Sequence, residues 1–117
     1  MSNVPELKNL PEKNRWYNAL KRVGQRAKLA GPVVNVYQAK DSRGMPIFVD
    51  VGSAYPGKSG FTLLIWAEDY DDFSEMLNQL GPSSWISVTG YLSSYNGRPQ
   101  YDVSDGSISY EWWTNVS

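Results

Sequence analysis

The sequence predicts a small, mainly β domain: a five-stranded Greek-key barrel with an N-terminal helix and a second helix between the third and fourth strands. From residue 26 onwards, strand-like runs alternate with Gly and Pro punctuation. Only two stretches, 10–23 and 68–80, place apolar residues at helical spacing. The 117 residues fit one domain. The predicted organisation is a flexible N-terminus over 1–9, a basic helix over 10–25 and the barrel over 26–117.

The first helix is predicted from its start signal and its apolar face. Asn9 is the predicted N-cap, and Glu12 follows at capping-box spacing. Trp16, Leu20 and Val23 fall at positions i, i+4 and i+7, which share one face of an α-helix. We therefore expect this face to dock on the barrel.

The strands are predicted from period-two alternation and from the turn residues between them. Ile47, Val49 and Val51 share one face, and Phe61, Leu63 and Ile65 are expected to face inward with Ile86 and Val88. Asn96-Gly97 is the strongest hairpin signal in the chain. The predicted strands are 26–38 with a bend or bulge at Gly31–Pro32, 45–51, 61–67, 84–93, and a last strand in two pieces, 100–103 and 107–112.

Composition argues against most enzyme classes. The chain has no Cys and no His, which removes disulfides, thiolate zinc sites, the usual general base and the commonest metal ligand. We therefore expect no enzyme activity, no cofactor and no metal site. No apolar run approaches the length of a membrane span, and the N-terminus lacks a signal-peptide core. The expectation is a soluble, cytoplasmic protein with no membrane partner.

Charge is unevenly distributed along the chain. Residues 1–30 hold seven basic and two acidic side chains, a balance of +5, whereas residues 31–117 hold four basic and ten acidic ones, a balance of −6. A polyanion is drawn to one end of such a molecule and repelled by the other. The alternative is that the basic residues are only the solvated face of a helix.

A series of short motifs resembles the OB-fold nucleic-acid-binding superfamily, in particular its small bacterial single-stranded-DNA-binding type. The likeness covers about residues 26–110. The matching positions are Gly31, Val33, Phe48, Gly52, Tyr55, Pro56, Phe61, Thr62, Ile65, Trp66, Val88, Thr89, Gly90, Tyr95, Gly97, Pro99 and Gln100. OB barrels bind oligomers with the second and third strands and with the loops joining strands 1–2 and 4–5.

The candidate binding residues fall into two groups. Flat rings can stack on unpaired bases, or they can simply complete a small core; these rings are Phe48, Tyr55, Trp66 and Tyr91. Loop residues can contact phosphates and bases, or can be ordinary solvated side chains; these are Tyr95, Arg98 and Gln100 in one loop, Lys40 and Arg43 in another, and Lys58 beside Tyr55. The Trp112-Trp113 pair marks an interface or packs back on the N-terminal helix through Trp16.

The sequence therefore predicts single-stranded DNA binding with little sequence preference, in replication, recombination or repair, with RNA left open as the ligand. The expected protein partner is a helicase or a nuclease, and a homo-oligomer is left open. The alternative is an OB-fold protein-interaction module in a DNA-processing complex, which the acidic barrel favours.

Overall fold

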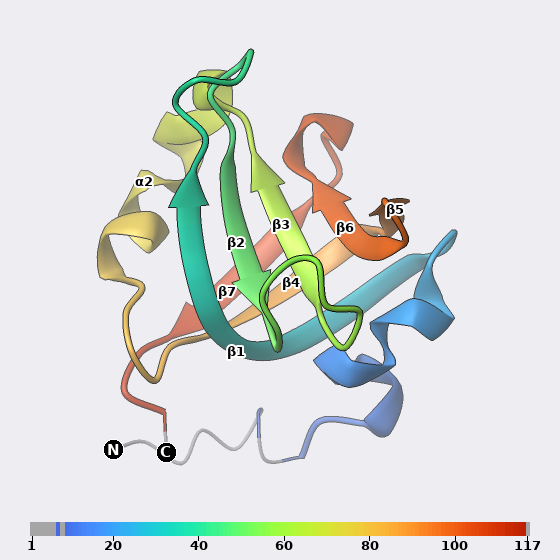
Figure 1. Cartoon of the computed structure of the whole chain (residues 1–117). Helices are drawn as coiled ribbons and strands as arrows, with labels where there is room; N and C mark the ends of the chain where they lie inside the picture. Colours follow the sequence, from blue (N-terminus) through green and yellow to red (C-terminus); the bar gives the residue numbers. More distant parts are fainter. Residues whose placement is uncertain (1–6, 8, 117) are drawn as a thin grey trace.

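The computed structural model describes Leu7 and residues 9–116 (Figure 1). Most of the segment 1–9, which we expect to be flexible, lies outside the described residues. The fold is mainly β, with seven strands in one sheet of order β5-β6-β3-β2-β1-β4-β7. The strands are β1 (Arg26–Gln38), β2 (Ile47–Val51), β3 (Phe61–Ile65), β4 (Trp85–Tyr91), β5 (Ser93–Tyr95), β6 (Arg98–Asp102) and β7 (Ser109–Trp113).

This seven-stranded sheet differs from the predicted five-stranded barrel. Neighbouring strands are antiparallel, except that β3 and β6 are parallel. The end strands β5 and β7 do not pair with each other in the described part of the chain. The predicted last strand is two strands, because a 3₁₀ turn, η4 (Val103–Asp105), and Gly106 at φ 82° redirect the chain between them.

The long strand β1 joins the two halves of the sheet. Figure 1 shows it as a strongly curved strand, and its residues 26–32 pair with β4 while residues 33–38 pair with β2. Pro32, which has no N–H to donate, lies where the partner changes. The register shifts between Val33 and Asn35, just beyond the predicted bend at Gly31–Pro32.

The core lies where the alternation predicts. The inward-facing residues expected in β2, β3 and β4 are all buried in one cluster. The other face of β3 is covered as well: Thr62 is 3 % and Leu64 is 6 % exposed. Alternation along β3 predicts that these two residues face away from the core; they lie on that face, yet both are buried.

The predicted second helix forms between β3 and β4. It is α2 (Tyr70–Gln79), preceded by a 3₁₀ turn, η3 (Ala67–Asp69). Phe73 and Met76 are buried one turn apart on its inner face, as the spacing predicts. The helix stops before Gly81-Pro82. Within residues 9–116, no helix is both long enough and apolar enough to cross a membrane.

The predicted N-terminal α-helix is instead two 3₁₀ helices, η1 (Glu12–Asn14) and η2 (Trp16–Arg22). Between them Arg15 is extended and forms a bridge with Ala30 of β1. A 3₁₀ helix has three residues per turn, so positions i and i+3 coincide. Ala19 is therefore buried below Trp16, whereas Leu20 is 48 % exposed; the expectation that Leu20 shares the docking face is wrong.

Trp16 seats η2 on the sheet. A Cβ at Gly31 would come within 2.7 Å of the Trp16 Cβ, and one at Gly52 would overlap the indole. The indole also meets Trp85 edge to face at 5.3 Å. The two glycines leave the space that this ring fills.

The C-terminal tryptophans diverge. Trp112 packs against the main core, lies 6.0 Å from the Tyr110 ring and donates from Nε1 to Gln79. Trp113 joins a smaller cluster with Trp85. Trp113 therefore lies beside the tryptophan that contacts Trp16, and neither C-terminal indole is a freely exposed ring.

Candidate functional site

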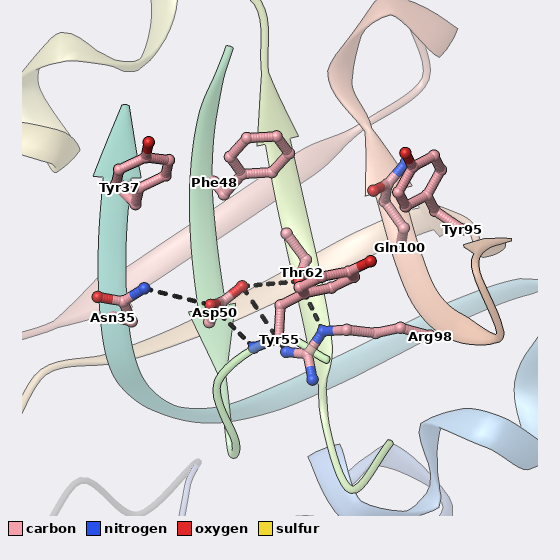
Figure 2. Close-up of a pocket in the computed structure, with 9 residues that line it drawn as sticks. All are labelled: Asn35, Tyr37, Phe48, Asp50, Tyr55, Thr62, Tyr95, Arg98 and Gln100. Atoms are coloured by element: carbon pink, nitrogen blue, oxygen red, sulfur yellow. Dashed lines mark hydrogen bonds and ion pairs between the residues drawn. The ribbon is translucent and has the colours of Figure 1, made fainter. Parts of the chain in front are cut away.

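A groove of about 440 Å³ crosses the face of β1, β2, β3 and β6 on the side opposite the core (Figure 2). The loop 52–60 and the turn between β5 and β6 border it. Its lining residues are Asn35, Tyr37, Phe48, Asp50, Tyr55, Thr62, Tyr95, Arg98 and Gln100.

Strand register places these side chains in rows. One row crosses all four strands through Asn35, Asp50, Thr62 and Gln100, which are successive partners across the sheet. A second row begins with the cross-strand pair of Tyr37 and Phe48. Because residues two apart on a strand share a face, both rows point into the groove.

Four aromatic rings surround the groove. Tyr37 and Phe48 are nearly parallel, with an interplanar angle of 15° and centroids 6.4 Å apart. Tyr55 and Tyr95 face each other across the loops, also at 6.4 Å. Tyr37 is 58 %, Tyr95 57 % and Tyr55 47 % exposed. Large rings this accessible offer flat surfaces to a ligand.

Arg98 lies under the groove and is only 1 % exposed. Nε donates to Thr62 Oγ1 at 2.7 Å; Nη1 donates to Ser53 Oγ at 3.2 Å and to the Gly57 carbonyl; Nη2 donates to the carbonyls of Ser53 at 2.7 Å and Phe61 at 2.9 Å. A guanidinium has five N–H donors, and all five are used within the protein. Arg98 therefore has no donor left for a phosphate, contrary to the role predicted for it.

Asp50 is the charge partner of Arg98. The two side chains approach to 3.8 Å, and both are buried. Burial lowers the pKa of Arg98, and the Asp50 carboxylate opposes that shift. Asp50 also accepts from Thr62 Oγ1 at 2.8 Å and from the Tyr55 backbone N–H at 3.2 Å. The charges inside the groove thus cancel, and the surface offered to a ligand is rings and amides.

The predicted site residues divide into two sets. Five line the groove: Phe48, Tyr55, Tyr95, Arg98 and Gln100. The other five lie outside it: Trp66, Tyr91, Lys40, Arg43 and Lys58.

Each outlying residue has its own surroundings. The Trp66 indole lies against Gly44 and donates to Asp102 at 2.9 Å, so it is part of the packing. Tyr91 borders a smaller hollow of about 200 Å³ beside Asp102. Lys58 lies next to the β5–β6 turn, where a Cβ at Gly97 would come within 3.1 Å of its Nζ.

Lys40 and Arg43 are exposed in the loop between β1 and β2. They do not line the groove, and no neighbour restrains their charged ends among the described hydrogen bonds and ion pairs.

Sequence reasoning missed four groove residues: Asn35, Tyr37, Asp50 and Thr62. Alternation along β1 puts Asn35 and Tyr37 on one face, and that signal was available. What the sequence did not reveal was the pairing of Tyr37 with Phe48 and of Asn35 with Asp50, which depends on strand register.

Within Leu7 and residues 9–116, no three His, Cys, Asp or Glu side chains gather closely enough to hold a metal. Comparison of the chain with protein-family models, curated proteins and solved structures gives no match. Function must therefore be inferred from the groove itself.

Proposed function

We propose that this protein binds single-stranded DNA in the groove, with little sequence preference. The observation that carries the proposal is the set of four rings around the groove, three of them exposed and Phe48 half-buried, together with the pairing of the groove's two charges, Arg98 and Asp50. Every base has a π-face, so stacking holds single strands of any sequence. The likeness of the chain to the single-stranded-DNA-binding type supports the same ligand, and replication, recombination or repair are the processes in which it would act.

We further propose that the sheet is an OB-type Greek-key barrel. Three features support this. β1 pairs with both β2 and β4, and β3 pairs in parallel with β6. Only Leu92 separates β4 from β5, so the two can be counted as one strand. Its first part, β4, pairs with β1, and its last part, β5, pairs with β6. With β4 and β5 counted as the fourth strand of the barrel, β6 is the fifth. The groove then lies on the second and third strands beside the turn that joins the fourth and fifth, which is where OB folds bind oligomers.

In this proposal the groove holds bases and the phosphates lie outside it. Arg98 has no free N–H and is the only cation in the lining. Lys58 beside the β5–β6 turn, and Lys40 and Arg43 in the β1–β2 loop, are the cations available for phosphates. The basic N-terminal segment adds attraction at longer range.

The test is a fluorescence anisotropy titration with labelled oligo-dT. The native protein should bind, and Phe48→Ala should weaken binding about tenfold, since one stacked base contributes roughly 1–3 kcal/mol. Trp66→Phe is the matched control, because this ring lies outside the groove. The Trp66→Phe protein should bind oligo-dT with nearly native affinity. No binding by the native protein at low salt would contradict the proposal.

The alternative is a protein-interaction module that docks an apolar segment of a helicase or nuclease partner. The observation that favours it is charge: residues 31–117 carry ten acidic and four basic side chains, one of which is Arg98. In that case the oligonucleotide titration stays flat, even at low salt where nucleic-acid binding is strongest.

A further inference from the structure

The loop 52–60 and the β5–β6 turn are exposed segments, yet both are tied to the sheet at several points. Exposed loops are usually mobile, because few contacts restrain them. Here the loop carries Tyr55 and the turn follows Tyr95, so the two segments present half of the groove's rings. Their restraint therefore decides where those rings lie.

The ties converge on the buried network of Arg98, Asp50 and Thr62. Arg98 binds the loop at three acceptors: the Ser53 hydroxyl and the carbonyls of Ser53 and Gly57. These positions flank Tyr55 on both sides. Hydrogen bonds from Arg98 therefore hold the loop on both sides of Tyr55.

Tyr55 itself is held at both ends. Its backbone N–H donates to Asp50 Oδ2 at 3.2 Å. Its phenol oxygen accepts from Asn96 Nδ2 at 3.0 Å, which connects it to the β5–β6 turn. In the view of Figure 2 the Tyr55 ring overlaps Thr62, and the Arg98 guanidinium is drawn below both. A ring fixed at its backbone and at its far end has little freedom to move.

The turn is fixed by its own conformation and by Arg98. Asn96 and Gly97 have φ values of 51° and 81°, as a type I′ turn requires. Arg98 is the next residue, and it pairs across the hairpin with Tyr95. The same side chain that clamps the loop therefore anchors the strand that begins at the turn.

We propose that Arg98, Asp50 and Thr62 form a positioning network that holds Tyr55 and the β5–β6 turn in a ligand-ready arrangement. The inference rests on the proposed function. In this inference Arg98, the most buried charge in the groove, holds other groove residues in place and does not contact the ligand. Preorganised side chains lose less freedom on binding, and so bind more tightly. A lysine cannot replace Arg98, because one ammonium cannot reach acceptors arranged around a planar fork.

The sharpest variant is Thr62→Val. It keeps the side-chain shape but removes the hydroxyl that accepts from Arg98 and donates to Asp50. Thr62→Ser keeps the hydroxyl and is the conservative partner. We expect Thr62→Val to weaken oligo-dT binding by about threefold to tenfold, and Thr62→Ser to restore most of that loss.

A double-mutant cycle separates positioning from general damage. In a Tyr55→Ala background, Thr62→Val should weaken binding little further, because the ring that it positions is gone. In a Tyr37→Ala background, it should have its full effect, since none of the Arg98 or Asp50 contacts reaches that ring. Equal effects in the two backgrounds would overturn the proposal.

A second measurement does not depend on any ligand. The Tyr55 amide, which donates to Asp50, should exchange its hydrogen about tenfold or more faster in Thr62→Val than in Thr62→Ser, while β1 amides exchange alike. Unchanged Tyr55 exchange would refute the positioning role even if DNA binds. If native protein binds no oligonucleotide but Tyr55 exchange rises as expected, the proposed function fails and the positioning network stands.

Discussion

Tyr37 is the most exposed ring of the groove and lies at the end of β1, paired across the strands with Phe48. The ring lies on the face of the sheet opposite the core. In the proposed function, a base bound in the groove would cover it. Its position beside Phe48 makes a continuous platform of two rings.

At this scale, Tyr37→Ala should weaken oligo-dT binding about tenfold with little change in stability. The matched control is Tyr91→Ala, which removes a tyrosine that is 47 % exposed on a different part of the surface. Anisotropy titrations of both variants make the comparison. Equal losses of affinity would mean that the ligand does not select the groove.

Tyr101 is a buried phenol whose ionisation opposes folding. Its O–H donates to the Ala27 carbonyl at 2.7 Å, and burial raises its pKa above the ordinary value of 10.0. A raised pKa in the folded state means that the stabilisation is complete below pH 10 and is lost as pH rises beyond it. The free energy of unfolding should therefore fall above about pH 10.

Tyr101→Phe tests this assignment by chemical denaturation at several pH values. At neutral pH it should cost about 1 kcal/mol, because the Ala27 carbonyl loses its donor. Above pH 10 its stability should decline less steeply than that of the native protein. A variant that loses stability in parallel with the native protein would assign the alkaline decline to other groups.

At the scale of elements, the N-terminal segment shows how tertiary packing selects a helix type. Its sequence carries an α-helical start signal, yet the chain forms two 3₁₀ helices with Arg15 extended between them. Two contacts attach this segment to β1: the bridge between Arg15 and Ala30, and the packing of Trp16 against Gly31. An uninterrupted α-helix would leave Arg15 no extended backbone for that bridge.

Gly52→Ala should disrupt this docking. The substitution adds a methyl that overlaps the Trp16 indole, and it does so at φ 83°. Gly106→Ala is the matched control, with φ 82° and no atom within 4 Å of the new methyl. Backbone strain should cost each variant roughly 1–2 kcal/mol.

The difference between the two variants isolates the packing of Trp16. Gly52→Ala should lose about 1–3 kcal/mol more than Gly106→Ala, the usual cost of overfilling a packed site. Urea unfolding of both proteins measures it. Equal losses would mean that Trp16 moves aside freely, and that η2 is loosely held.

At the scale of the whole molecule, the excess positive charge and the groove belong to different parts of the chain. The basic excess belongs to residues 1–30, whereas the groove lining carries one internal ion pair. Long-range attraction by the N-terminal segment would speed encounter with a polyanion, and ring stacking would hold it. Affinity should thus depend only weakly on salt.

The salt dependence gives a quantitative expectation. With Lys58, Lys40 and Arg43 as the nearby cations, the logarithm of the affinity should fall with the logarithm of salt by a slope of about 2. Lys58→Ala should reduce that slope by about 0.7. Titrations from low to moderate salt measure both values. A much steeper slope would indicate further phosphate contacts, most simply from a second copy of the chain.

The sequence alone determined what depends on local pattern. Period-two alternation identified the buried faces of β2, β3 and β4, helical spacing identified α2, and Asn96-Gly97 identified the β5–β6 hairpin. Tertiary structure decided what depends on register and docking. It set Tyr37 beside Phe48, paired the two predicted pieces of the last strand with different neighbours as β6 and β7, and changed the N-terminal helix to 3₁₀ geometry. It also moved Arg98 from an expected phosphate contact to a buried clamp, because its acceptors come from residues 36 to 45 positions away in the chain. No local pattern encodes a partner that distant.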